Sequence, residues 1–131
     1  MAAIVITKFD HERLTKLLGL KRPHDEFDRA LLAELAKAKI VEPAQVPPDV
    51  ITMNSKVRFK NEQGEALTYW LVFPEDADIS NHKMSILSPI GCALIGYKVG
   101  DTITLHTPNG SRKLMVEEIL HQPEREGDFQ S

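Results

Sequence analysis

The segment that most limits how this chain can fold is a proline-rich stretch, EPAQVPPD, at residues 42–49. Proline cannot donate a backbone hydrogen bond and disfavours helix in the residue before it, so three prolines in eight residues end any preceding helix. Helical spacing stops here, and strand-like alternation begins. We therefore predict an α+β protein with an N-terminal helical hairpin and linker over residues 1–48 and a sheet domain over residues 49–131.

Two amphipathic helices are expected before the prolines, within residues 9–20 and 24–41. In the first, Asp10 is the expected N-cap, because its carboxylate can accept from the free amides of the first turn, and Gly19 offers a stop. The second is expected to end at about Val41. Because the link between them is short, the two helices should fold back on each other as an antiparallel hairpin.

Strands are expected after the linker. Alternating or β-branched residues predict them at residues 50–59, 66–73, 102–107 and 112–120. Between the last two, Asn109-Gly110 strongly favours a tight hairpin turn. Tyr69 and Trp70 lie within the second of these strands, where packing in the core is the default expectation for aromatic residues.

The stretch SPIGCALIGYKVGD, residues 88–101, contains the only cysteine and invites two chemical interpretations. Gly91 and Gly96 have the interval of a phosphate-binding loop, but the next residue is Tyr97, where that motif requires lysine. Cys92 would need a neighbouring base or positive field to act as a nucleophile, and no histidine has a recognisable spacing from it. Neither interpretation is supported by the residues that its chemistry needs.

The same stretch has the pattern of a short helix. Ser88 suits the N-cap, and Pro89 suits the first helical position because it has no amide to satisfy. We therefore predict a short helix set across the sheet, a chain that is not an enzyme, and no cofactor or metal, since the five histidines also lack metal-ligand spacing.

The net charge limits which partners the chain can bind, and the cysteine content limits its cellular compartment. The formal net charge is -3, which gives no long-range attraction to phosphate backbones, so we expect no specific nucleic-acid binding by the chain alone. Lys56, Arg58 and Lys60 alternate on one face of a predicted strand, as on a solvated sheet face. One cysteine cannot form an internal disulfide, and no long apolar run indicates a membrane span, so a cytoplasmic protein is expected.

Three acids, Asp25, Glu26 and Asp28, gather at the predicted start of the second helix, beside the hairpin tip. Acids at a helix start complement the helix dipole, and this structural role is the simpler interpretation. The functional alternative is an acidic tip that holds a metal or touches a basic partner.

Residues 81–110, NHKMSILSPIGCALIGYKVGDTITLHTPNG, resemble the C-terminal domain of the Gre transcript-cleavage factors. In that domain an S-P-x-x-x-A-L-I-G segment precedes a Gly-Asp pair, a strand and a P-x-G turn. The whole chain more closely resembles the Rnk proteins, the regulators of nucleoside diphosphate kinase, which are relatives of the Gre factors. The resemblance implies an FKBP-like sheet domain preceded by an antiparallel coiled coil.

The resemblance also implies a partner. In Gre factors the loop with the Ser-Pro pair, here Ser88 and Pro89, docks on bacterial RNA polymerase beside its secondary channel. Where the family often has an acidic or amide residue just before the serine, this chain has Leu87. Gre factors also carry paired acids at the end of a long coiled coil. The two helices expected here, of about 10 and 16 residues, span only roughly 15 to 25 Å.

We therefore expect a regulator that binds RNA polymerase at the rim of the secondary channel and competes with Gre-type factors without cleaving transcripts. Two alternatives stay open. One is direct or indirect regulation of nucleoside diphosphate kinase. The other is a transcript-cleavage factor that uses Asp25, Glu26 and Asp28, although these acids fall in no alignable copy of the Gre acidic motif.

Overall fold

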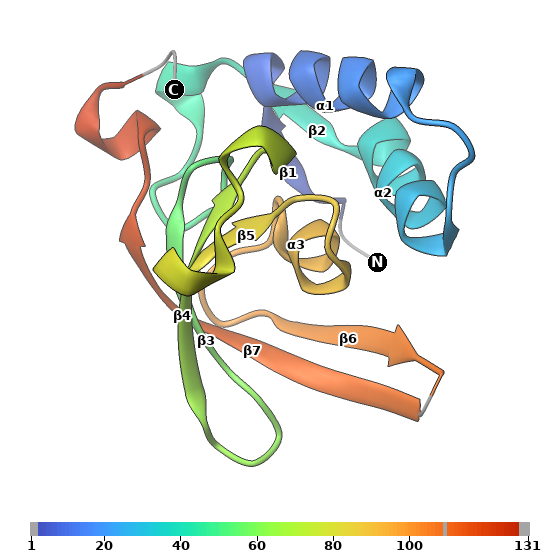
Figure 1. Cartoon of the computed structure of the whole chain (residues 1–131). Helices are drawn as coiled ribbons and strands as arrows, with labels where there is room; N and C mark the ends of the chain where they lie inside the picture. Colours follow the sequence, from blue (N-terminus) through green and yellow to red (C-terminus); the bar gives the residue numbers. More distant parts are fainter. Residues whose placement is uncertain (1–2, 109, 129–131) are drawn as a thin grey trace.

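The computed structural model describes residues 3–108 and 110–128, and over these it confirms a mixed α+β chain whose two longer α-helices precede the larger sheet (Figure 1). The α-helices are α1 (Lys8–Leu20), α2 (Glu26–Lys37) and α3 (Pro89–Leu94). A small parallel sheet pairs β1 (Val5–Thr7) with β2 (Lys39–Val41). The larger sheet has the order β5-β4-β3-β7-β6, from β3 (Lys56–Lys60), β4 (Ala66–Val72), β5 (Lys83–Ser85), β6 (Thr102–Thr107) and β7 (Gly110–His121).

The first helix begins earlier than expected. The N-cap is Thr7, whose hydroxyl accepts from the Asp10 amide at 3.1 Å, so the prediction that Asp10 caps α1 is wrong. Asp10 instead lies in the first turn, with only 1% of its surface exposed, and its carboxylate accepts from the buried amide of Met53 at 3.0 Å. A threonine three residues upstream provides the same capping chemistry, which frees the aspartate for this long-range contact.

The second helix ends at Lys37, four residues before the predicted end at about Val41. Residues Lys39–Val41 form β2, which pairs in register with Val5–Thr7. The helices therefore have 13 and 12 residues, in place of about 10 and 16. None of the helices in the described ranges combines the length and apolar character needed to cross a membrane.

In the larger sheet, β3 is antiparallel to both β4 and β7, and β6 is antiparallel to β7, whereas β5 runs parallel to β4. Regular pairing of β3 starts at Lys56, later than the predicted residue 50, because the preceding segment bonds elsewhere: the Ile51 amide donates to the Tyr97 carbonyl at 2.8 Å. The β6–β7 hairpin predicted from Asn109-Gly110 is present. Asn109 itself lies outside the described residues, and Gly110 has a φ of +118°.

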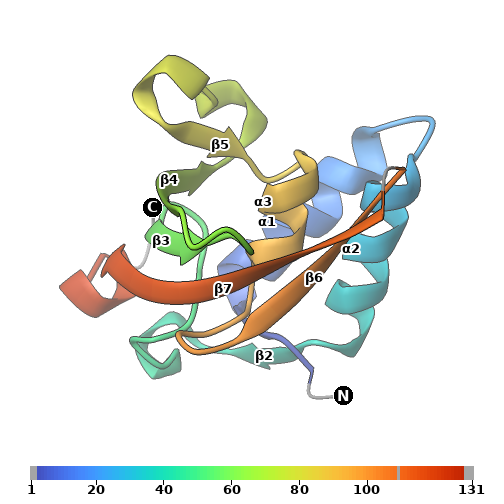
Figure 2. The ribbon, with the colours of Figure 1, turned by 90° about the horizontal axis from the view of Figure 1, so that it is seen from below.

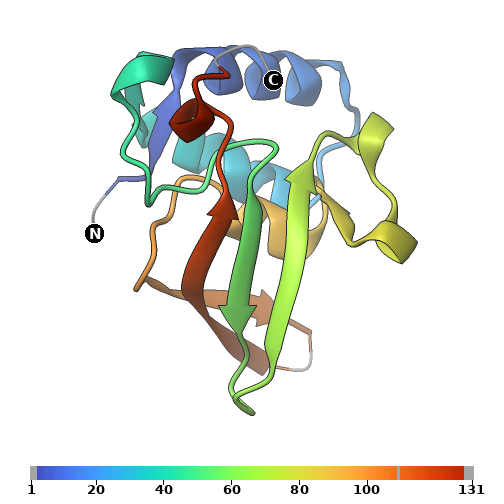
Figure 3. The same ribbon diagram turned by 90° about the vertical axis from the view of Figure 1, so that its left-hand side faces the viewer.

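One hydrophobic cluster joins the two halves of the chain. It contains Leu14 and Leu18 of α1, Leu31 and Leu35 of α2, and sheet residues such as Phe59, all at most 3% exposed. Helices α2 and α3 lie behind β7, β3 and β4 in Figure 3, and α1 lies above these strands, so the sheet turns one face toward α2 and α3 and the other away. The β6–β7 hairpin runs past α3 and α2 (Figure 2), and α3 packs against both α2 and β6.

Candidate functional site

The loop that enters α3 is held by its own hydrogen bonds. The Ser88 hydroxyl accepts from the Gly91 amide at 3.0 Å and donates to the Ser85 carbonyl at 2.7 Å. The Leu87 amide donates to the Ser85 hydroxyl at 3.0 Å. Ser88 is thus the N-cap and Pro89 the first helical residue, as predicted, and Pro89 remains exposed. We call residues 85–91 the Ser88 loop.

Gly91 is required by close packing inside the Ser88 loop. A Cβ at this position would lie 2.2 Å from the Ser85 carbonyl oxygen and 2.9 Å from the Ser88 hydroxyl. Its amide is already taken by Ser88, and the Gly96 amide donates to the Ile51 carbonyl at 2.9 Å. Since a phosphate cradle needs free amides, these two glycines serve the fold.

Cys92 is half-buried in α3, and its thiol lies 3.2 Å from the Pro89 carbonyl oxygen. Burial, followed by the negative charges of Asp25 and Asp28, raises the pKa of the Cys92 thiol to about 11. A thiol with this pKa is protonated at neutral pH, which disfavours the nucleophile interpretation.

The three acids at the hairpin tip have different surroundings. Asp25 is the N-cap of α2 and forms a capping box with Asp28, while Glu26 is exposed. Lys21 Nζ lies 2.7 Å from Asp28, whose side chain is only 1% exposed. Burial alone would raise the pKa of Asp28, but the hydrogen bonds from Lys21 and the Asp25 amide outweigh it and hold that pKa below its usual value.

The hairpin tip and α3 meet in space, although about 60 residues separate them in sequence. Helices α2 and α3 pack against each other, and the charges of Asp25 and Asp28 act on Cys92. The sequence indicated the Ser88 loop and the tip acids separately. In the structure they lie at the starts of α3 and α2, two helices that pack against each other. Within residues 3–108 and 110–128, no group of three or more His, Cys, Asp or Glu side chains could hold a metal ion.

Two histidines bond to backbone carbonyls of α1 and α2. His11 Nε2 donates to the Leu35 carbonyl at 3.1 Å, and His24 Nε2 donates to the Leu18 carbonyl at 2.7 Å. Each histidine links two backbone segments, so its Nε2 atom is already used in a hydrogen bond.

A feature that the sequence prediction missed lies on the larger sheet. Trp70 points away from the core, where it contacts Lys56 and His121, with the rings of Trp70 and His121 5.4 Å apart. Tyr69 faces the opposite side and stacks on Phe59. The period of two along β4 could have shown this, because burial of Leu71 places its neighbour Trp70 on the other face.

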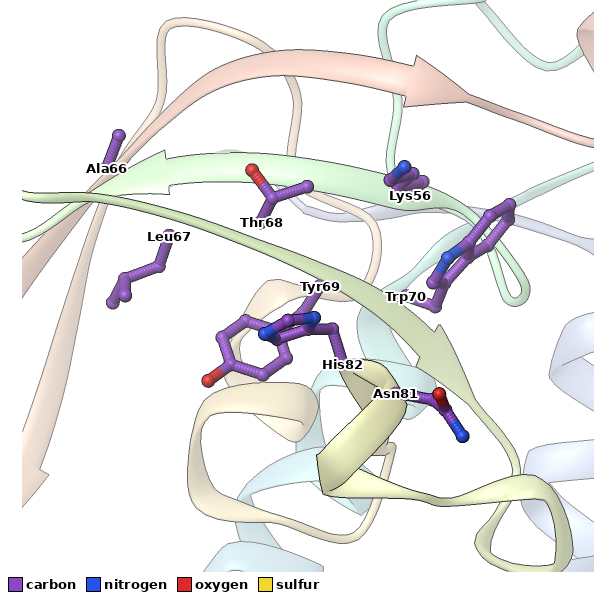
Figure 4. A pocket seen from close by; sticks show the side chains of 8 residues that line it. All are labelled: Lys56, Ala66, Leu67, Thr68, Tyr69, Trp70, Asn81 and His82. Carbon is purple, nitrogen blue, oxygen red and sulfur yellow. The ribbon is translucent and has the colours of Figure 1, made fainter.

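A shallow hollow of about 420 Å³ borders the first five residues of β4, from Ala66 to Trp70 (Figure 4). Lys56 and Trp70 come from neighbouring strands, and Tyr69 and His82 lie edge to face with their rings 5.5 Å apart. The lining residues are Lys56, Ala66, Leu67, Thr68, Tyr69, Trp70, Asn81 and His82.

Comparisons with known proteins place both halves of the chain in families. Residues 3–41 match the family described as Rnk N-terminus, and residues 46–121 match the family described as transcription elongation factor, GreA/GreB, C-term. The regulator of nucleoside diphosphate kinase from Escherichia coli (strain K12) is 40% identical over 134 residues, which cover 96% of this chain and 95% of that protein.

The transcription elongation factor GreA of Christiangramia forsetii is 40% identical over 89 residues, 67% of this chain and 56% of that protein, so the chain spans only about half of that relative. Among solved structures, a GreA/GreB transcription elongation factor from Nitrosomonas europaea superposes with a TM-score of 0.78 at 40% identity, over 92% of this chain and all of that one. The chain therefore belongs to the Rnk proteins, relatives of the GreA and GreB transcription elongation factors.

Proposed function

We propose that this protein is a cytoplasmic, non-enzymatic transcription regulator that binds bacterial RNA polymerase at the rim of the secondary channel. It competes there with Gre-type factors and does not cleave transcripts. The observation that carries the proposal is the Ser88 loop, which presents an exposed proline on a chain related to transcription elongation factors. In the same proposal the larger sheet with α3 is of FKBP type, and α1 and α2 correspond to a shortened coiled coil.

Within the Ser88 loop, the two residues of the Ser-Pro pair have different roles. The Ser88 hydroxyl both donates and accepts inside the loop, so it sets the loop's shape. Pro89 is exposed, and its fixed φ makes it a rigid contact that loses little entropy when a partner covers it. Polymerase binding is therefore expected through Pro89, with Ser88 holding it in place.

The helical half supports binding without cleavage. At 1.5 Å per residue, α1 and α2 are about 20 and 18 Å long. Their tip packs near α3, and two of the three tip acids are engaged in the capping box. A hairpin of this length keeps its acids close to the sheet domain. This fits a protein that occupies the channel entrance and, by mass action, lowers the fraction of polymerase available to competing factors.

The test is binding of fluorescently labelled protein to core RNA polymerase, with an unlabelled GreA as competitor. Saturable binding that GreA displaces is expected, together with unchanged transcript cleavage in stalled complexes. Pro89→Ala should weaken binding, while Pro48→Ala, at an exposed proline of the linker, should not. Absence of binding at micromolar concentrations, or stimulated cleavage, would contradict the proposal.

A second candidate function is regulation of nucleoside diphosphate kinase, which the name of the Escherichia coli relative favours. Direct regulation requires a complex, so co-purification of the two proteins tests it. An effect on kinase levels without a complex would instead mean indirect control through transcription.

A third candidate, transcript cleavage by the tip acids, is best tested with Asp25→Asn and Glu26→Gln together. These changes remove charge, and asparagine can still cap α2. Alanine at all three acids would also remove the cap and the Asp28 ion pair, so a loss of activity could reflect unfolding of the tip.

A further inference from the structure

Four neighbouring strands each place one residue in a row on the outer face of the larger sheet. Lys83 of β5 is paired with Trp70 of β4, Trp70 with Lys56 of β3, and Lys56 with His121 of β7. Lys56 Nζ lies 5.6 Å from the centre of the Trp70 ring. The centres of the Trp70 and His121 rings are 5.4 Å apart. We call these four residues the Trp70 row.

The lysines of the Trp70 row differ from the neighbouring cations of β3, which are paired with acids. Farther along the same strands, Arg58 forms ion pairs with Glu117 and Glu118, and Lys60 lies 3.1 Å from Glu117. By contrast, Lys56 and Lys83 make no ion pair with any residue of the described chain. Two lysines without an ion pair in the described chain therefore lie in the same row as one aromatic ring.

Hollows on the two sides of Trp70 differ in charge. The first, of about 420 Å³, is lined by the polar groups of Lys56, Thr68 and Asn81 and by no acid of the described residues (Figure 4). The second, of about 430 Å³, is lined by Lys83 and His121 but also by Asp76. An anion is therefore best accommodated in the first hollow, next to the ring.

We propose that the Trp70 row binds single-stranded nucleic acid, with a base stacked on Trp70 and the adjoining phosphates at Lys56 and Lys83. Single strands are held by aromatic faces combined with a positive surface, and stacking tolerates any base because every base has a π-face. The ring with Lys56 at the acid-free hollow, and Lys83 in the neighbouring hollow, provides both parts of that chemistry. Binding is sequence-independent and weak, with a dissociation constant on the order of 10⁻⁵ to 10⁻⁴ M.

Trp70 reports on its own site, because it is the only tryptophan in the chain. Titration with the octamers rU8 and dT8 should quench its fluorescence to saturation. If two phosphates are neutralised, the logarithm of the binding constant should fall against the logarithm of salt concentration with a slope of about −1.4. Stronger binding of rU8 than of dT8 would show a preference for RNA over DNA. Equal binding would support a site for any single strand.

A charge-matched pair of variants separates the row from general attraction. Lys56→Gln with Lys83→Gln should weaken binding about tenfold at low salt and bring the salt slope near zero. Lys37→Gln with Lys98→Gln, at exposed lysines outside the row, removes the same charge and should have little effect. Trp70→Leu, followed by anisotropy of a labelled octamer, should also lose binding, with melting temperatures showing that each variant is folded.

No saturable quenching up to millimolar octamer would overturn the proposal. Equal weakening by the two lysine pairs would overturn it as well, since the row would then have no special role. In a competition experiment with labelled rU8, pyrophosphate should displace it less effectively than unlabelled rU8. Equal displacement would show an anion site without base stacking and would also contradict the proposal. Because no polymerase is present, these outcomes are independent of the polymerase-binding test.

Discussion

Asp25 and Asp28 exchange two hydrogen bonds at the start of α2. The Asp28 amide donates to the Asp25 carboxylate at 2.8 Å, and the Asp25 amide donates to the Asp28 carboxylate at 3.0 Å. Lys21 Nζ lies 2.7 Å from the same Asp28 oxygen. A metal at this tip would have to displace backbone donors and an ammonium group, so the geometry favours a structural role for these two acids.

Removing the cap should therefore destabilise the protein. Asp25→Ala is expected to lower the free energy of unfolding by about 1 kcal/mol, because it leaves the Asp28 amide without its acceptor. Glu26→Ala, at the exposed neighbour, should change it by less than about 0.5 kcal/mol. Urea unfolding of both variants measures the difference, and equal stabilities would contradict the capping role.

The Asp28–Lys21 pair should make stability depend on pH at both extremes. The folded-state pKa of Asp28 is lowered, so its contribution is present above the usual carboxyl pKa and is lost as pH falls through the folded value. The hydrogen bond to Asp28 raises the pKa of Lys21, so that contribution is present below the usual lysine pKa and is lost as pH rises through the folded value.

Melting temperatures from pH 2 to 7 test the acid side of this dependence. Asp28→Asn should melt at a lower temperature near neutral pH, and its difference from the natural protein should shrink as pH falls below about 4. The comparison matters because Asp10 acts in the opposite sense: burial raises its pKa, so its charge opposes folding. A constant difference across the range would show that the Asp28 charge contributes nothing.

Local signals in the sequence predicted what is local in the structure. The Ser88 cap and Pro89 lie within one turn of α3, so their pattern is sufficient to place that helix. Strand β2 was missed because its partner is Val5–Thr7, more than 30 residues away, and helical apolar spacing simply continued into it. Trp70 was assigned to the core by residue type, although strand alternation puts it outside.

Gly91 provides a test of the Ser88 loop. Alanine there would put its Cβ 2.2 Å from the Ser85 carbonyl oxygen, so the loop must shift and the cap must weaken. We expect Gly91→Ala to lower stability by about 1–3 kcal/mol and to weaken polymerase binding. Gly19→Ala meets no atom within 4 Å in α1 and should stabilise the protein by up to about 1 kcal/mol. Equal stabilities of the two variants would refute this packing argument.

The shared core predicts that both halves of the chain unfold together. Leu31→Ala, at a residue 1% exposed, should lower the free energy of unfolding by about 2–5 kcal/mol. It should also shift one transition, seen equally by circular dichroism and by fluorescence of Trp70 in the sheet. Leu20→Ala, at a residue 77% exposed, is the control and should have little effect. Two separate transitions would mean that residues 1–48 and 49–131 fold independently.

Gly110→Val tests the β6–β7 hairpin. Gly110 has a φ of +118°, a region that a β-branched residue strongly resists, and a Cβ there would meet no atom within 4 Å. The loss, about 1–3 kcal/mol, should therefore come from backbone strain alone. Arg112→Val introduces the same side chain two residues along β7, at an exposed position without positive φ, and should leave the melting temperature nearly unchanged. If both variants melt alike, the hairpin does not depend on glycine at this turn, and the Asn109-Gly110 pattern is not what holds the two strands in register.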